Sequence, residues 1–280
     1  STLSPEVLTT VLRDEMGFDG IVFTDAMDMR AISRQHNSGE AAVRAIEAGA
    51  DVILMPASVK GAVEGIVEAV SSGRITERRL DESVMRVLDT KEDLSLQEDR
   101  LVQIERISQH VGVPDHLDVA NRIAESSLTL LKNDRDLLPL AGTRTARVLS
   151  VSYRRSSDVL AGRYFNRVLR ETYPRLTTAE VDADTQQSIY QGLTRRAREQ
   201  DMVVVSTYVT SVNVSGSFML PEDLVDFITE LRRIGVPHTV VSFGNPYLIK
   251  DFSDVQSYLL AWSGSEASQR AAGRALLGQI

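Results

Sequence analysis

Apolar residues in the first ninety positions occur in two alternating patterns. Val7, Val11 and Leu12 recur at helical spacing, which predicts a helix over residues 4–16 that ends at Gly17. Residues 21–23 form a short continuous apolar run, as is typical of a strand buried on both faces. The alternation continues, with helices predicted over residues 39–48, 59–70 and 80–88 and a strand over residues 51–56. This order predicts parallel strands joined by helical crossovers.

The pattern changes between residues 92 and 116, where polar residues dominate and neither period persists. Such a stretch is typical of a connection between domains. We therefore expect a first domain over residues 1–93, an interdomain linker over residues 94–116 and a second domain over residues 117–280.

Helix-like and strand-like segments alternate again in the second domain. A strong helical pattern covers residues 117–132, and four later apolar runs predict strands among further helix-like segments. The predicted strands cover residues 146–152, 202–207, 239–243 and 259–263, and the predicted helices cover residues 157–173, 187–199, 221–235 and 265–277. The second domain is therefore predicted to be a separate α/β layer structure.

Composition narrows the class of protein. The chain has 280 residues, 42% hydrophobic and 25% charged, as is typical of a globular protein. Its formal net charge of −8 argues against nucleic acid or an anionic membrane as the main partner. The absence of cysteine excludes disulfides, thiolate metal sites and cysteine nucleophiles. No apolar run approaches the roughly 20 residues that span a bilayer, so we expect no membrane span in this segment.

Asp25 is the leading candidate for chemistry. It follows the predicted strand at residues 21–23, and in parallel α/β structures ligands bind at the carboxyl ends of strands. A carboxylate at this place serves as a nucleophile, as a metal ligand or as a cap for the following turn. No group of side chains has metal-ligand spacing, so the first and the last of these roles stay open. Asp51, at the start of the second predicted strand, is expected to be a turn residue.

Longer motifs surround Asp25. The segment LRDEMGFDG (residues 12–20) is followed by TDAMDMRAI (residues 24–32). Further motifs are AGADVILMP (residues 48–56), SVMRVLDTK (residues 83–91), AESSLTLLKN (residues 124–133), LLPL (residues 137–140), FGNPY (residues 243–247) and AWS (residues 261–263). In this order they resemble family 3 glycoside hydrolases, and more narrowly the β-N-acetylglucosaminidase branch of that family.

The resemblance implies a fold and a reaction. The expected fold class is α/β, with the C-terminal part of a TIM-type (β/α)8 barrel followed by an α/β/α sandwich domain. The implied activity is hydrolysis of terminal β-linked N-acetylglucosamine by a retaining double displacement, with Asp25 as the nucleophile and without a cofactor. Thr24 and backbone N–H groups at the strand tip are expected to help keep Asp25 ionised. The implied partner is a glycan derived from peptidoglycan or chitin, in a bacterium, and the cytoplasmic or extracytoplasmic compartment stays open.

The second catalytic group is expected to lie outside this chain. In the acetylglucosaminidase branch the acid/base role resembles a His/Asp pair on a loop that precedes the nucleophile strand, and no His precedes Asp25. His36 is interpreted as a solvated or substrate-adjacent loop residue. Asp28 and Met29 are interpreted either as lining the sugar subsite or as supporting it from behind and capping the following turn. We therefore expect the chain to be the C-terminal part of a longer enzyme and to be inactive alone.

Three alternatives to an acetylglucosaminidase remain open. A β-glucosidase or β-xylosidase of the same family is the first of them, and its acid would be a Glu from the second domain, for which Glu222 and Glu266 are candidates. A glycoside phosphorylase is the second. A noncatalytic glycan-binding module on the same scaffold is the third.

Overall fold

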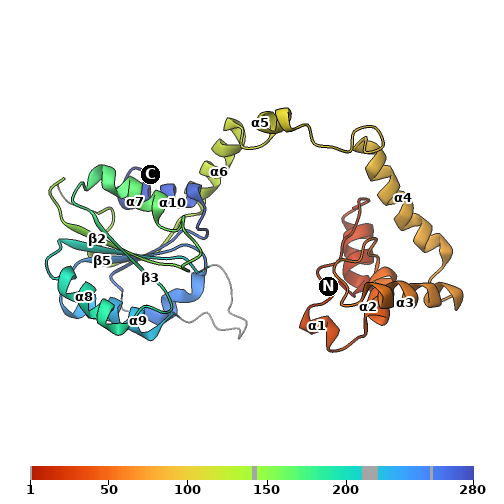
Figure 1. Cartoon of the computed structure of the whole chain (residues 1–280), viewed down its shortest axis with the longest axis horizontal. Helices are drawn as coiled ribbons and strands as arrows, with labels where there is room; N and C mark the ends of the chain where they lie inside the picture. Colours follow the sequence, from red (N-terminus) through yellow and green to blue (C-terminus); the bar gives the residue numbers. More distant parts are fainter. Residues whose placement is uncertain (1, 141–143, 210–219, 253–254) are drawn as a thin grey trace. The chain divides into compact units, whose positions relative to one another are not determined.

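A computed structural model describes residues 2–140, 144–209, 220–252 and 255–280 of the chain. These residues form two compact units, Ser1–Ile107 and Ser108–Ile280, each with its own hydrophobic core (Figure 1). No helix in the part of the chain that the structure describes is both long and apolar enough to cross a membrane.

Helices make up most of the first unit. They are the π-helix η1 (Glu6–Glu15) and the α-helices α1 (Arg30–Ser33), α2 (Ser38–Ala48), α3 (Val59–Ser71) and α4 (Glu77–Asp93). The side chains of Asn37, Ser58 and Thr76 accept hydrogen bonds from backbone N–H groups in the first turns of α2, α3 and α4. Helix α2 ends at Gly49, whose φ of 116° is easily accessible only to glycine. The helices predicted in this part of the sequence are confirmed.

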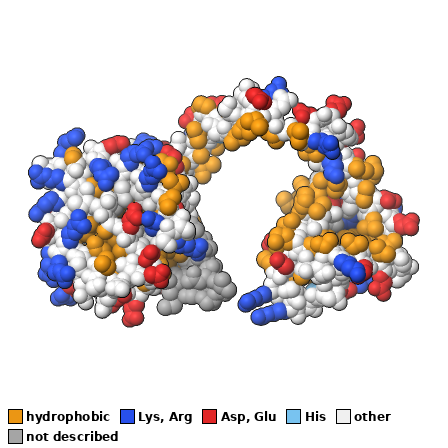
Figure 2. All heavy atoms as spheres, viewed as in Figure 1, with side chains coloured by type: hydrophobic (Ala, Val, Ile, Leu, Met, Phe, Trp, Pro, Cys, Tyr) orange, Lys and Arg blue, Asp and Glu red, His pale blue; other side chains and the backbone are white. Residues whose placement is uncertain are grey.

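Helices α2 and α3 pack closely because glycines lie at their crossing. A Cβ atom added at Gly65 would lie 2.5 Å from the Cα atom of Gly39. Beside this crossing, Val43 and Ile46 of α2 are buried with Ala69 of α3 and Ile75. Apolar side chains also remain on the surface of this unit (Figure 2). Val59, Val63 and Val67 on α3 are among the exposed ones.

The strands predicted over residues 21–23 and 51–56 are wrong as regular strands. Both segments are extended, but in the described residues only an isolated parallel bridge between Phe23 and Val52 joins them. Among the described residues of this unit each segment pairs only with the other, and the regular hydrogen-bond pattern stops directly after Thr24. The described part of the unit contains no closed sheet, so the barrel stays a prediction.

Short helices occupy part of the predicted linker. The 3₁₀-helix η2 (Ile104–Arg106) and helix α5 (Ile107–His110) lie within residues 94–116, and helix α6 (Pro114–Ser127) begins before residue 117.

The second unit is a six-stranded sheet between two layers of helices (Figure 1). The strand order is β1-β6-β5-β4-β2-β3, and all neighbours are parallel except β1 and β6. One core contains side chains of α7 and α10, and the other contains side chains of α8 and α9. The strands are β1 (Thr129–Asn133), β2 (Val148–Tyr153), β3 (Thr177–Val181), β4 (Met202–Thr207), β5 (His238–Ser242) and β6 (Ser257–Leu260). The helices are η3 (Asp134–Asp136), α7 (Arg163–Thr172), α8 (Gln187–Ala197), α9 (Glu222–Arg233), η4 (Pro246–Phe252) and α10 (Glu266–Leu276). The predicted α/β layer structure is confirmed.

Predictions for the second unit need correction in four places. The strand predicted over residues 259–263 is β6, which covers Ser257–Leu260, because its last paired residue is Leu260, opposite Thr129 and Ser242. The helix predicted over residues 117–132 ends at Ser127, because residues 129–133 form β1 and pair with β6. Strand β3 was not predicted, since it is a short edge strand with polar residues at three of its five positions. Helix α7 begins at Arg163 rather than at residue 157, after Gly162 with a φ of 78°.

Candidate active site

Asp25 follows directly on the extended segment that pairs with residues 51–54. The N–H of Val52 donates to the carbonyl of Val22 at 3.1 Å, and the N–H of Thr24 donates to the carbonyl of Val52 at 3.0 Å. Val22 and Thr24 are buried, whereas Asp25 is exposed. The carboxylate Oδ1 of Asp25 accepts a hydrogen bond of 2.7 Å from the N–H of Ala26. An exposed carboxylate at the carboxyl end of an extended segment is available to a ligand.

The hydroxyl of Thr24 does not have the expected partner. We expected it to support the charge of Asp25, but its Oγ1 atom accepts a hydrogen bond of 2.8 Å from the N–H of Leu54. The carbonyl of Leu54 in turn accepts a hydrogen bond of 3.0 Å from the N–H of Met27. Thr24 therefore connects the two extended segments, and its link to Asp25 is through the backbone.

Asp51 is a buried carboxylate with partners in three parts of the unit. Its side chain is 0% exposed. Oδ2 accepts hydrogen bonds from the Nη2 of Arg13 at 2.7 Å and from the N–H of Val22 at 2.9 Å. Oδ1 accepts from the Oγ of Ser83 at 2.6 Å and from the Nη1 of Arg86 at 3.0 Å. Asp51 was expected to be a turn residue rather than a ligand; beyond that expectation, the structure shows it as the centre of a buried hydrogen-bonded network.

Charges around Asp51 determine its ionisation. Burial alone raises the pKa of the Asp51 carboxyl, but the hydrogen bonds from Ser83 and Val22 and the charges of Arg86 and Arg13 outweigh it. The net result is a pKa below the usual value, so the group is ionised at neutral pH. Asp51, Arg13, Arg79, Ser83 and Arg86 are called the Asp51 cluster below.

The Asp51 cluster also holds the chain that leads to Asp25. The Nη1 of Arg13 donates to the carbonyls of Phe18 and Gly20 at 2.9 and 2.6 Å. The Nη2 of Arg79 donates to the carbonyl of Ala50 at 2.9 Å. Both extended segments are thus fixed at their amino ends by arginines that belong to helices.

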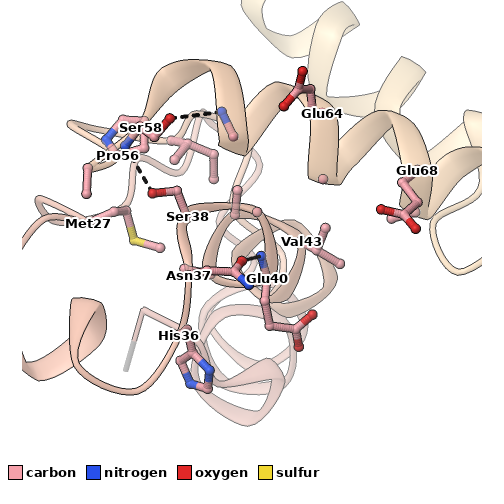
Figure 3. Close-up of a pocket in the computed structure, with 18 of the residues that line it drawn as sticks. Met27, His36, Asn37, Ser38, Glu40, Val43, Pro56, Ser58, Glu64 and Glu68 are labelled. Carbon is pink, nitrogen blue, oxygen red and sulfur yellow. Dashed lines mark hydrogen bonds between the residues drawn. The ribbon is translucent and has the colours of Figure 1, made fainter.

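The other residues predicted for the site lie on the following loop and helix. Asp28 and Met29 are exposed, and Met29 directly precedes α1. His36 is half-buried and lines a cavity of about 790 Å³ between α2 and α3, together with Met27, Asn37 and others (Figure 3). Asp25, Asp28 and Met29 are not among the residues that line this cavity. Of these four predicted site residues, His36 is therefore the one that lines this cavity.

Polar groups in this cavity are already engaged with one another. The Oγ of Ser38 accepts a hydrogen bond from the N–H of Ser58 at 3.0 Å, and the Oδ1 of Asn37 accepts one from the N–H of Glu40 at 2.9 Å (Figure 3). Arg74 and Arg44 donate to Glu40, and these two hydrogen bonds lower the pKa of Glu40 to about 2. These contacts hold α2 against α3 and cap their first turns.

Of the two candidate acids in the second unit, Glu266 has a structural partner. The carboxylate of Glu266 pairs with Arg270 one turn later at 2.6 Å, and Glu222 is exposed at the start of α9. Within the described ranges, no group of three or more His, Asp or Glu side chains has an arrangement that would hold a metal ion.

Two protein-family models together match most of the chain. Residues 1–90 match the model described as the N-terminal domain of glycosyl hydrolase family 3. Residues 128–280 match the model for the C-terminal domain of the same family. The chain belongs to glycosyl hydrolase family 3. The family assignment made from the sequence motifs is thereby confirmed.

Relatives within the family have several names. A β-N-acetylglucosaminidase/β-glucosidase of Cellulomonas fimi is 32% identical over 147 residues, which are 52% of this chain and 26% of that protein. A putative β-xylosidase of Formosa agariphila is 34% identical over 149 residues, 52% of this chain and 19% of that protein. The matched regions thus span about a quarter or less of these relatives.

Solved structures of family members share the fold. A family 3 β-N-acetylglucosaminidase from a Paenibacillus species matches 100% of this chain and 53% of its own chain, with a TM-score of 0.74 and 28% identity. A β-glucosidase from Listeria innocua matches 100% of this chain and 42% of its own, with a TM-score of 0.76 and 23% identity. The chain therefore spans about half of these family members.

Two parts of the site were missed in the sequence. The role of Leu54 has no local sequence signal, because it acts through its backbone. The Asp51 cluster has one: Arg79, Ser83 and Arg86 recur at helical spacing on one face of α4. Because two of these three residues are arginines, the row indicates a buried acidic partner when that face of the helix packs inward.

Proposed function

We propose that this chain supplies the nucleophile of a retaining glycosidase, and that Asp25 is that nucleophile. The observation that supports this most is the exposed carboxylate of Asp25 at the end of an extended segment, within the region that matches the family's N-terminal domain. Val22 and Thr24, just before it, are held by hydrogen bonds to residues 51–54. A nucleophile that is already oriented lowers the entropic part of the barrier.

The reaction proceeds in two displacements. A carboxylate oxygen of Asp25 forms a bond to the anomeric carbon while the bond from that carbon to the leaving oxygen breaks, and an acid outside the described residues gives that oxygen its proton. In the second step a water oxygen attacks the anomeric carbon and the ester bond to Asp25 breaks. The former acid now accepts the proton of the water. The anomeric configuration is retained.

We propose terminal β-linked N-acetylglucosamine as the substrate group, with peptidoglycan or chitin fragments as the glycan. The relatives from Cellulomonas and Paenibacillus carry this activity in their names. Asp28 and Met29, on the loop after Asp25, are proposed to contact the sugar, and His36 to line the approach to it. A β-glucosidase or β-xylosidase is the second candidate, because other relatives are named for these activities.

The chain is proposed to act as part of a longer enzyme. It spans about half of the solved family members. In the described part of the first unit a single bridge joins the two extended segments, and a row of apolar side chains on α3 is exposed. We therefore expect no turnover from the 280 residues alone.

Substitution of Asp25 in the whole protein tests the proposal. Asp25→Asn is expected to lower kcat on an aryl N-acetylglucosaminide by on the order of 10⁴-fold or more, because the amide is not a nucleophile. Asp19→Asn is the matched control, since Asp19 is exposed on the same stretch of chain and undergoes the same chemical change. Addition of azide to Asp25→Ala should restore release of the aryl group and yield the glycosyl azide of inverted configuration.

Three results would contradict the proposed function or its substrate. Full activity of Asp25→Asn would show that Asp25 is not the nucleophile and would favour a noncatalytic role of this site. Faster turnover of aryl glucoside or aryl xyloside than of the aryl N-acetylglucosaminide would exclude the proposed sugar, and dependence on phosphate would indicate a phosphorylase.

A further inference from the structure

Asp25 lies in a short segment whose two ends bind the same residue. Leu54 donates its N–H to the Oγ1 of Thr24 at 2.8 Å and accepts a hydrogen bond from the N–H of Met27 at 3.0 Å. Asp25 and Ala26 are the two residues between these contacts. Their backbone is thus anchored on both sides by one neighbouring residue.

This pattern departs from a regular parallel ladder by one residue. In such a ladder a residue bonds to two residues of its neighbour that are two positions apart. Val52 follows this rule, because it donates to Val22 and accepts from Thr24. By the same register Leu54 should donate to the carbonyl of Thr24 and accept from the N–H of Ala26. Instead the hydroxyl of Thr24 replaces its carbonyl, and Met27 replaces Ala26.

The extra residue produces a bulge at Asp25. Alternation along a strand would bury Val22, Thr24 and Ala26 on one face. The buried residues are Val22, Thr24 and Met27, at 7%, 4% and 3% exposure, and Val22 and Met27 pack in the same core cluster. The inward face has therefore moved by one position after Thr24. Bulges of this kind redirect side chains next to active sites.

We propose that the hydroxyl of Thr24 is a positioning group for Asp25, because it accepts the Leu54 N–H that the bulge would otherwise leave without an acceptor. The inference rests on the proposed role of Asp25 as nucleophile. Thr24 acts through the backbone: its hydroxyl holds Leu54 and frees its own carbonyl, so the chain bends at Asp25. Without the hydroxyl, Leu54 regains a partner only if the carbonyl of Thr24 rotates back into the ladder and moves Asp25 with it.

The pair Thr24→Val and Thr24→Ser tests the proposal in the whole protein. Valine has nearly the same shape as threonine and lacks the acceptor, whereas serine keeps it. We expect Thr24→Val to lower kcat/KM on an aryl N-acetylglucosaminide by about 10- to 100-fold, as a displacement near 1 Å does. Thr24→Ser should stay close to the wild type. The inhibition constant of N-acetylglucosamine should be unchanged, because the sugar site itself is not altered.

Covalent labelling separates positioning from stability. A 5-fluoro-N-acetylglucosaminyl fluoride labels the nucleophile, and intact mass measures the rate. Thr24→Val should be labelled more slowly by the same factor as kcat/KM falls. Ile46→Ala is the control for stability, since Ile46 is buried in the cluster formed by α2, α3 and Ile75, and the hydrogen bonds that join Leu54 to Thr24 and Met27 do not involve it. It should lower the melting temperature and leave the labelling rate unchanged.

Each outcome bears on one proposal. Wild-type kcat/KM and labelling in Thr24→Val, together with an inactive Asp25→Asn, would overturn the positioning role and leave the nucleophile in place. An active Asp25→Asn would overturn the proposed function itself. If Thr24→Val does not fold, Thr24→Ala removes the hydroxyl with less bulk and should show the same loss. Wild-type kinetics in Thr24→Ala would overturn the positioning role equally.

Discussion

Loss of the Asp51 charge should destabilise the first unit more than any surface substitution. The carboxylate is 0% exposed and accepts four hydrogen bonds, three of them from Arg13, Ser83 and Arg86. In Asp51→Asn one oxygen becomes an NH₂ group, which faces donors that already point at it. Breaking a buried charge pair by removing one partner costs about 3–5 kcal/mol.

The structure places Asp51→Asn near the lower end of this range. The side chains of Arg79 and Arg86 are 22% and 31% exposed, so they regain hydration when the carboxylate is lost. Arg13 is only 13% exposed and keeps its backbone acceptors. We expect a loss of about 3 kcal/mol, which is a large part of the stability of a domain of this size.

Amide hydrogen exchange measured by mass spectrometry assigns the effect to the right unit. Since each 1.4 kcal/mol is a factor of ten, the protected amides of residues 18–24 and 79–90 should exchange on the order of 100-fold faster in Asp51→Asn. Trp262, the one tryptophan of the sequence, lies in the second unit. The unfolding transition that its fluorescence follows should therefore be the same in Asp51→Asn as in the wild type.

The pH dependence of the stability of the first unit is an independent check on the contribution of Asp51. Because the folded pKa of Asp51 is lowered, its contribution is fully present above the unfolded value of about 3.9 and is lost as the pH falls through the folded pKa. Asp51→Asn should remove that loss. Asp81→Asn is the matched control, as Asp81 is exposed on α4, the helix that carries Arg79, Ser83 and Arg86. If both variants exchange alike at neutral pH, the reasoning about the Asp51 cluster is refuted.

Three further substitutions test other parts of the fold. Gly65→Ala should destabilise the packing of α2 on α3 by roughly 1–3 kcal/mol, because its Cβ would lie 2.5 Å from the Cα of Gly39. Gly192→Ala, whose Cβ would meet nothing closer than 3.8 Å, should stabilise α8 by about 0.4–1 kcal/mol. Denaturant titrations that change the free energy of unfolding in the same direction for both variants would contradict this. Burial lowers the pKa of His238 below its ordinary 6.5, so the unfolded state is protonated first and the second unit should lose stability as the pH falls through 6.5. Trp262 fluorescence measures this slope, which should flatten in His238→Gln.

The sequence predicted helices more accurately than strands. Helices α2 and α3 carry their signals locally: an apolar stripe, a capping Asn37 or Ser58, and Gly49 at the end of α2. Strand β1 carries no such signal. Its Thr129-Leu130-Leu131 run continues the apolar pattern of α6, and only pairing with β6, far along the chain, makes it a strand. Tertiary contacts therefore determine the secondary structure of this segment, against the preference of its local pattern.

In the candidate site, too, some features have a local sequence signal and others depend on contacts between distant residues. Asp25 was found because its neighbours form a recognisable pattern at the end of an apolar run. The contact between Thr24 and Leu54 joins residues 30 positions apart, and one partner is a backbone amide. Asp51 looked like a turn residue because its partners lie in η1 and α4. Local patterns therefore indicated the reactive group, and the residues that hold it required the structure.

The pairing of β1 with β6 has a consequence for synthesis of the protein. Strand β1 is made first among the strands of the described sheet, and β6, its one neighbour there, is made last. Ribosomes add roughly 5–20 residues per second, so β1 waits on the order of ten seconds for its partner to be translated. During this interval Leu130 and Leu131 belong to an unpaired edge, which is a target for chaperones and for misassembly between nascent chains. The sheet is completed only after residue 260 has left the ribosome.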